Sequence, residues 1–124
     1  MKNLNLAEEC GVTVNSLENA KIFVKAYGIP EKITLTGDPS EADYVVNCEW
    51  GRLFSLITFD FTGFSWGYGG EGPRGLYTFL HDICKATEVK METIINLELK
   101  PRESRIVYSK LSINHTNLQK EKKI

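Results

Sequence analysis

The fold is decided by residues 44–61, YVVNCEWGRLFSLITFDF. Apolar and polar side chains alternate over residues 44–50, which predicts a strand with one buried face. A second β-rich run, residues 53–61, follows directly after the tight connection Gly51-Arg52. Because parallel neighbours need a long crossover, this short spacing predicts an antiparallel hairpin.

One helix is expected before the hairpin in the sequence and another after it. Asn15 is placed to cap the first helix, with Glu18 three residues later, and Gly28 followed by Pro30 predicts its end. Pro73 suits the first turn of a second helix, which should fray near residues 86–88. Their expected buried faces are Ala20, Phe23, Val24 and Tyr27 in the first helix, and Leu76, Phe79, Leu80 and Ile83 in the second.

Shorter runs complete the expected architecture. Residues 33–36, 93–99 and 107–113 predict further strands, and the first 14 residues, whose pattern is weak, are consistent with a short one. The order of elements predicts an α+β fold, with a mostly antiparallel β-sheet and two packed helices. We expect a single ligand-binding domain over residues 1–118 and a charged flexible tail over residues 119–124.

Composition narrows the class of partner. The chain has 124 residues, 15 Lys and Arg, 16 Asp and Glu, and a formal net charge of −1, which gives no support to a long nucleic acid. No apolar run approaches the roughly 18–20 residues that span a membrane, and the N-terminus has no apolar signal region. We therefore expect a cytoplasmic protein with no membrane partner.

The sequence does not predict reactive chemistry. Its three cysteines are far apart, which is typical of reduced, buried thiols rather than of a disulfide framework or a zinc site. No nucleophile with a base and an orienting group can be assembled. We expect no catalytic residues, no metal and no cofactor, and hence a protein that is not an enzyme.

The most distinctive segment is residues 63–75, GFSWGYGGEGPRG, which holds six of the ten glycines. Glycine lets the main chain approach a ligand closely, and the segment leads into a helix start, where unpaired N–H groups favour anions. Aromatic rings here would stack on a base, and arginines would meet phosphate. The candidate ligand-binding residues are Trp66, Tyr68, Gly70, Glu71, Gly72 and Arg74, with Arg102 and Arg105 closing over the ligand from another part of the fold.

Other interpretations of these residues are open. The segment is also consistent with a tight corner whose aromatic side chains fill the core. Glu71 could serve only to stabilise the helix start, and Arg102 and Arg105 could be solvated surface residues. Gly67, Gly69 and Gly72 match the dinucleotide-binding fingerprint, but that site needs a parallel βαβ unit. An antiparallel preceding strand argues against it.

Residues 66–76, WGYGGEGPRGL, resemble the anti-Thoeris proteins of phages, which act as sponges for cyclic ADP-ribose signals. A related group of small bacterial proteins carries a similar segment. The resemblance implies a homo-oligomer, a dimer or higher, with pockets where subunits meet. It also implies tight binding of a cyclic ADP-ribose isomer without cleavage, in the cytoplasm of an infected bacterium, so that TIR-based (Thoeris) defence is blocked. Some members of that family also hold cyclic oligonucleotides at a separate site.

Two alternatives to a sponge are open from the sequence. One is an enzyme that cleaves a nucleotide signal, and the other is a structural or protein-binding domain in which the glycine-rich segment is only a corner.

Overall fold

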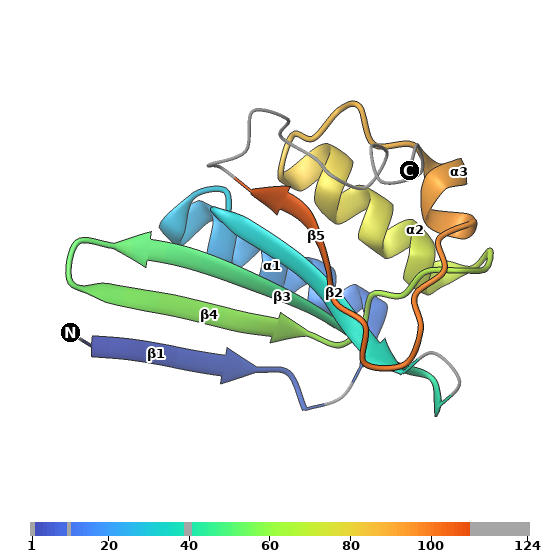
Figure 1. Ribbon diagram of the computed structural model, residues 1–124. Helices are drawn as coiled ribbons and strands as arrows, with labels where there is room; N and C mark the ends of the chain where they lie inside the picture. The colour runs from blue at the N-terminus through green and yellow to red at the C-terminus, as the bar shows by residue number, and fades with distance from the viewer. Residues whose placement is uncertain (1, 10, 39–40, 110–124) are drawn as a thin grey trace.

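The computed structural model describes residues 2–9, 11–38 and 41–109 (Figure 1). The described strands are β1 (Lys2–Ala7), β2 (Lys32–Asp38), β3 (Asp43–Arg52), β4 (Ser55–Phe61) and β5 (Arg105–Ser109). The described helices are α1 (Thr13–Tyr27), α2 (Glu71–Tyr77), the π-helix η2 (Thr78–Ile83), which continues α2, and α3 (Met91–Ile95).

The strands form one sheet in the order β1-β4-β3-β2-β5. All neighbouring pairs are antiparallel except β1 and β4, which run parallel. The protein is therefore an α+β domain with a mostly antiparallel sheet. The strand that follows α2 in the described chain is β5, which pairs antiparallel with β2 and not with β4. The glycine fingerprint thus lies outside any parallel βαβ unit, and the dinucleotide interpretation does not hold.

The predicted hairpin is confirmed as β3 and β4, although its turn lies further along the chain than expected. Arg52 pairs with Ser55, so Leu53 and Phe54 form the turn, and they are 85% and 74% exposed. The Arg52 guanidinium donates to the Tyr27 carbonyl at 2.8 Å and lies over the Tyr27 ring. These contacts with the end of α1 hold Arg52 in the strand, where the sequence predicted a turn.

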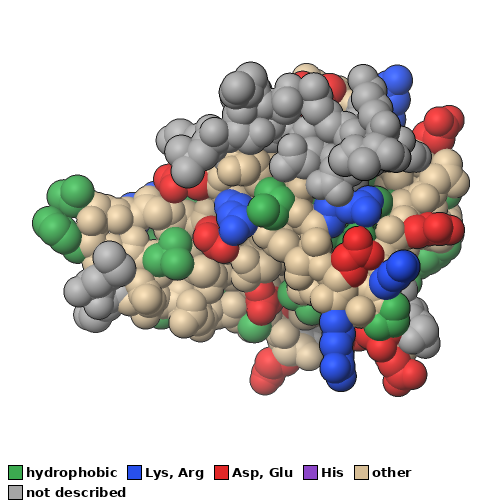
Figure 2. All heavy atoms as spheres, in the orientation of Figure 1, with side chains coloured by type: hydrophobic (Ala, Val, Ile, Leu, Met, Phe, Trp, Pro, Cys, Tyr) green, Lys and Arg blue, Asp and Glu red, His purple; other side chains and the backbone are tan. Residues whose placement is uncertain are grey.

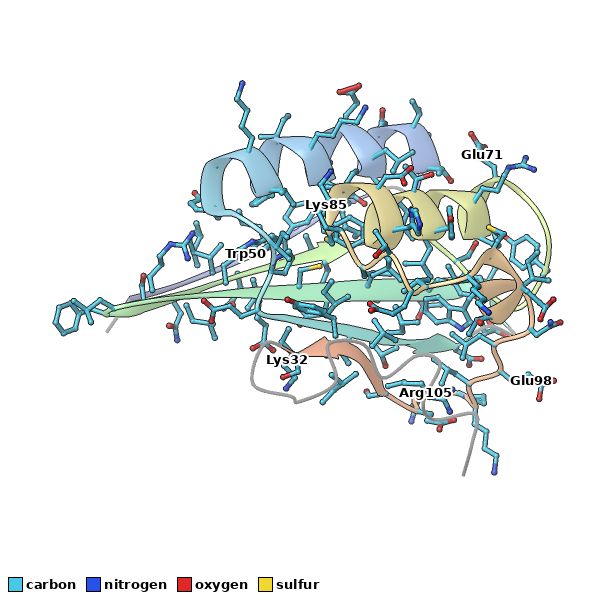
Figure 3. All side chains as sticks on the ribbon, turned by 90° about the horizontal axis from the view of Figure 1, so that it is seen from above. Lys32, Trp50, Glu71, Lys85, Glu98 and Arg105 are labelled. Atoms are coloured by element: carbon cyan, nitrogen blue, oxygen red, sulfur yellow. The ribbon has the colours of Figure 1, made fainter. Side chains whose placement is uncertain are left out.

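The helices α1 and α2 lie side by side on one face of the sheet (Figure 3). Trp50 of β3 lies beneath α1, with its ring 5.5 Å from that of Phe23, and its Nε1 donates to the Gly28 carbonyl at 2.8 Å. The predicted faces of both helices are those that pack on the sheet. Fully buried among them are Ala20, Leu76, Phe79 and Leu80, and half-buried are Phe23, Val24, Tyr27 and Ile83.

The start of α1 differs from the prediction. The helix begins at Thr13 after the extended residue Val12, and no side chain caps it, so Asn15 lies within the first turn rather than before it. Instead, the Thr13 hydroxyl donates to the Gly63 carbonyl at 2.7 Å. A tertiary contact with the glycine-rich segment thus fixes this end. The predicted end is confirmed, because Gly28 has φ 88° and its N–H bonds to the Val24 carbonyl.

The strand expected over residues 93–99 is wrong. Residues Met91–Ile95 form α3, with adjacent Thr93 and Ile94 both buried, which an alternating strand would not allow. Leu97 and Leu99 are buried in alternation, but their segment pairs with no described strand. They fill the core from a connection without regular secondary structure, so their apolar alternation reflects burial and not strand pairing.

The remaining predicted elements are the short strands, the second helix and the C-terminal tail, and only some of their residues are described. The short N-terminal strand and residues 33–36 are confirmed as β1 and part of β2. The second helix starts at Glu71, two residues before Pro73, and its continuation η2 ends at Ile83, before the predicted fraying point. Of the strand expected over 107–113, β5 covers residues up to Ser109. The rest of that strand and the tail over 119–124 lie outside the described residues.

Two general properties bear on partners. None of the described helices is long and apolar enough to cross a membrane. Figure 2 shows acidic and basic side chains interspersed over the described part of one face of the molecule.

Candidate ligand-binding cavities

The glycine-rich segment is held where β1, α1 and β4 meet. The Glu8 carboxylate, just after β1, accepts bonds from the Ser16 hydroxyl at 2.6 Å, the Thr62 N–H at 2.7 Å and the Asn19 amide at 2.7 Å. The Ser16 hydroxyl also accepts from the Gly63 N–H at 3.0 Å. This cluster fixes the direction in which the chain leaves β4.

The aromatic residues of the segment divide between core and surface. Phe64 is fully buried and stacks on Phe79 at 5.3 Å, while Trp66 is 2% exposed and meets Tyr44 edge to face at 4.9 Å. Tyr68 is 46% exposed. The corner interpretation therefore holds for Phe64 and Trp66, whereas Tyr68 lies on the surface. Two cavities flank this arrangement.

The larger one, which we call the Trp66 cavity, has a volume of about 580 Å³, within the range of small-molecule sites. It lies between the glycine-rich segment and the connection from α3 to β5. Figure 3 shows Glu98 and Arg105 near the same end of the molecule. Its lining residues are Tyr44, Trp66, Gly67, Leu97, Glu98, Leu99, Lys100, Glu103 and Arg105.

The Trp66 cavity combines aromatic, cationic and acidic groups. Lys100 and Arg105 supply positive charge, and the Arg105 guanidinium lies 3.8 Å from the Glu103 carboxylate. The Trp66 Nε1 is enclosed and has no hydrogen-bond acceptor among the described residues. A buried donor left without a partner costs about 1–3 kcal/mol.

The second one, which we call the Tyr68 cavity, has a volume of about 320 Å³. The Ser65 and Tyr68 hydroxyls bond to each other at 2.8 Å, and the buried Thr62 hydroxyl has no partner among the described residues. Its lining residues are Gly11, Thr13, Ala42, Tyr44, Thr62, Gly63, Phe64, Ser65, Tyr68, Glu71 and Gly72.

Tyr44 lines both cavities, and sequence reasoning missed it because its place in the strand alternation predicted a core side chain. Its ring lies 4.9 Å from Trp66 and 6.4 Å from Tyr68. Burial, with a smaller contribution from the neighbouring Tyr68, raises the pKa of Tyr44 above its usual value. The hydroxyl is therefore neutral at physiological pH. Tyr44 is the second residue of β3, and a side chain so close to the end of a strand can lie at the margin of the core, which is the signal that could have marked it as a cavity residue.

The structure does not bring the eight predicted residues into one site. Trp66 and Arg105 line the Trp66 cavity, and Tyr68, Glu71 and Gly72 line the Tyr68 cavity. Gly70, at the N-terminal end of α2, and the exposed Arg74 line neither cavity. Arg102 lies in an exposed turn, with φ 66° and its N–H bonded to the Gly37 carbonyl. It lines a separate hollow with Asp38 and Asp43.

The described residues hold no group of three or more His, Cys, Asp or Glu side chains placed to bind a metal. Cys48 and Cys84 are buried free thiols, as predicted, and Cys10 lies outside the described residues. Burial raises the pKa of Cys84 to about 12 and raises that of Cys48 well above its usual value. Both therefore stay protonated and unreactive at neutral pH.

Comparison with protein-family models, with curated proteins and with solved structures finds no match to this chain.

Proposed function

We propose that this protein binds and sequesters a cyclic ADP-ribose-type signalling nucleotide in the Trp66 cavity, without cleaving it. The sequence support is the resemblance of residues 66–76 to the anti-Thoeris sponges. The observation that carries the proposal is the lining of the cavity, which joins Trp66 of that segment to the charged connection before β5. Sequestration there would block TIR-based defence in the cytoplasm of an infected bacterium.

The lining offers a partner for each part of such a ligand. A pyrophosphate would meet Lys100 and Arg105, whose charge-assisted hydrogen bonds to phosphate are strong. Ribose hydroxyls would donate to the carboxylates of Glu98 and Glu103. Adenine would lie against the apolar walls, and a ring nitrogen or phosphate oxygen would accept from the Trp66 Nε1.

Sequestration depends on slow release and on an excess of protein, not on chemistry. Affinity differences between related complexes lie mostly in the dissociation rate. A cavity wall built from a buried, well-packed side chain such as Trp66 favours slow release of the ligand. From the resemblance we also propose a homo-oligomer, a dimer or higher, and cyclic oligonucleotides as a second class of ligand at a separate site.

The location of the site is tested by calorimetric titration of the full chain with cyclic ADP-ribose isomers. We expect tight binding by the native protein and a loss of roughly tenfold or more for Arg105→Gln, since one charge-assisted contact contributes about 1.5–3 kcal/mol. The matched control is Arg74→Gln, which removes an exposed arginine outside the cavity and should bind as the native protein does.

Each other outcome selects an alternative. A loss confined to Arg74→Gln would place the ligand at the start of α2 and contradict the Trp66 cavity as its site. Turnover of more than one equivalent per site would identify an enzyme that cleaves the signal. Absence of heat with every isomer would leave a structural or protein-binding domain.

A further inference from the structure

We propose that the Tyr68 cavity is a separate binding site for a primary ammonium group. It is distinct from the Trp66 cavity in its walls, because no residue of the connection between α3 and β5 lines it. It is formed instead by the end of β4, the glycine-rich segment and the N-terminal ends of α1 and α2. Among the described residues, Tyr44 is the one shared by the two cavities.

The charge of the lining favours a cation. Among the described residues that line the cavity, Glu71 is the one charged side chain, and none is a lysine, arginine or histidine. Glu71 lies at the start of α2, at the edge of the molecule (Figure 3). An anion such as a phosphate would meet this full negative charge, with only the partial positive charge of the helix N-terminal ends to offset it.

The hydroxyl groups supply acceptors for hydrogen-bond donors. The Thr62 hydroxyl is buried and unpartnered among the described residues, and Thr62 lines the cavity, so a ligand that shifts this wall slightly would supply the missing partner. The Ser65 and Tyr68 hydroxyls bond to each other but keep acceptor capacity. An ammonium group has three donors and no acceptor, and it would satisfy Thr62, this hydroxyl pair and Glu71 together.

The aromatic walls favour the same ligand. Tyr44, Phe64 and Tyr68 all line the cavity, and the Tyr44 and Tyr68 rings are tilted at 51° with centroids 6.4 Å apart. A cation near the face of such rings is stabilised by their quadrupoles. Because hydroxyl acceptors accompany the rings, a primary ammonium fits better than a quaternary one, which has no N–H to donate.

The test is an NMR titration of the isotope-labelled full chain with propylammonium chloride at pH 7. We expect saturable shifts at Thr62, Ser65 and Gly72, and affinity at least tenfold higher than for neutral 1-propanol and several-fold higher than for tetramethylammonium. Glu71→Gln should weaken propylammonium binding about tenfold. The control Glu92→Gln, at an exposed carboxylate in α3, should leave it unchanged.

A second variant separates binding from folding. Thr62→Val removes a hydroxyl that makes no bond within the described protein, so stability in urea should stay the same or rise, while propylammonium affinity falls several-fold. The proposal is overturned by shifts that do not saturate, by equal response to 1-propanol, or by unchanged affinity in both variants. None of these results depends on whether cyclic ADP-ribose binds in the Trp66 cavity.

Discussion

Gly72 shows, at the scale of a single residue, why the glycine-rich segment is built as it is. A Cβ at this position would lie 1.9 Å from the Ser65 hydroxyl, which is bonded to Tyr68. At Gly69 a Cβ would meet nothing within 4 Å. The absent side chain is therefore required at Gly72 to keep the Tyr68 cavity in shape, while Gly69 has no such constraint.

This contrast predicts opposite effects for two similar substitutions. Gly72→Ala should lower the free energy of unfolding by about 1–2 kcal/mol, since Ser65 must move and overpacking outweighs the gain in helix propensity. Gly69→Ala should leave it unchanged or raise it by up to about 1 kcal/mol, by restricting the unfolded chain. Urea denaturation of both variants measures the difference, and equal destabilisation would contradict the steric argument.

The buried thiols predict a pH dependence at the same scale. Cys84 has its pKa raised to about 12 by burial, against an ordinary value of 9.0. Below pH 9 the thiol is protonated in both states and has no effect. Between pH 9 and 12 only the unfolded chain releases the proton, so the free energy of unfolding should fall by about 1.4 kcal/mol per pH unit through Cys84.

Denaturation at pH 8.5 and at pH 10.5 checks this prediction. In a Cys84→Ala variant the fall between the two pH values should be smaller by about 2 kcal/mol, because about 1.5 pH units of that interval lie above the ordinary thiol pKa. The variant starts less stable because its core is less filled. An identical pH slope in the variant and the native chain would show that Cys84 is accessible to solvent in the folded state.

At the scale of elements, Glu8 is the residue that joins three of them. Its carboxylate accepts from Ser16 and Asn19 of α1 and from the Thr62 N–H at the end of β4, while its own N–H bonds to the Asp60 carbonyl at 3.0 Å. Hydrogen bonds to a charged group are stronger than neutral ones. Within the described sheet β1 is an edge strand whose backbone pairs with β4, and the Glu8 cluster adds side-chain links from the end of β1 to α1 and to the end of β4.

Glu8→Ala should therefore lower the free energy of unfolding by about 2–3 kcal/mol, because three donors lose a charged acceptor. The neighbouring exposed residue provides the control, and Glu9→Ala should change it by no more than about 0.5 kcal/mol. Chemical denaturation gives both values. If the two variants are equally stable, the Glu8 cluster does not hold the strand in place.

The elements that local pattern predicted well are those whose burial follows one period. The hairpin of β3 and β4 and the apolar faces of α1 and α2 belong to this group. Local sequence pattern failed to predict the structure where contacts between residues distant in the sequence determine it. Thr13 is held by Gly63, fifty residues away, so the apparent cap at Asn15 was misleading. Leu97 and Leu99 alternate because they fill the core, not because a strand pairs with them.

The candidate site was harder to predict than the fold. Sequence reasoning proposed one site from eight residues of the glycine-rich segment and the stretch before β5, and the structure divides them among two cavities, the start of α2 and a turn at Arg102. Tyr44, which lines both cavities, was not predicted at all. Proximity between β3, the segment and residues 97–105 depends on the sheet order, which local sequence does not specify.

At the scale of the whole molecule, we propose that this protein acts as a stoichiometric binder. Its two cavities have different linings: the Trp66 cavity carries both cations and carboxylates, whereas Glu71 is the one charged residue among those described in the Tyr68 cavity. A nucleotide with a pyrophosphate suits the first cavity and not the second. Binding of the signal should therefore respond to Arg105→Gln and be insensitive to Glu71→Gln.

The central claim, sequestration without cleavage, is tested most directly by recovery of the ligand. The native protein is mixed with one equivalent of a cyclic ADP-ribose isomer, separated from free ligand, denatured by heat, and the released material is chromatographed. The account predicts that the ligand is retained by the folded protein and then recovered as the intact cyclic molecule. Recovery of linear ADP-ribose, or failure of the protein to retain any isomer, would contradict it.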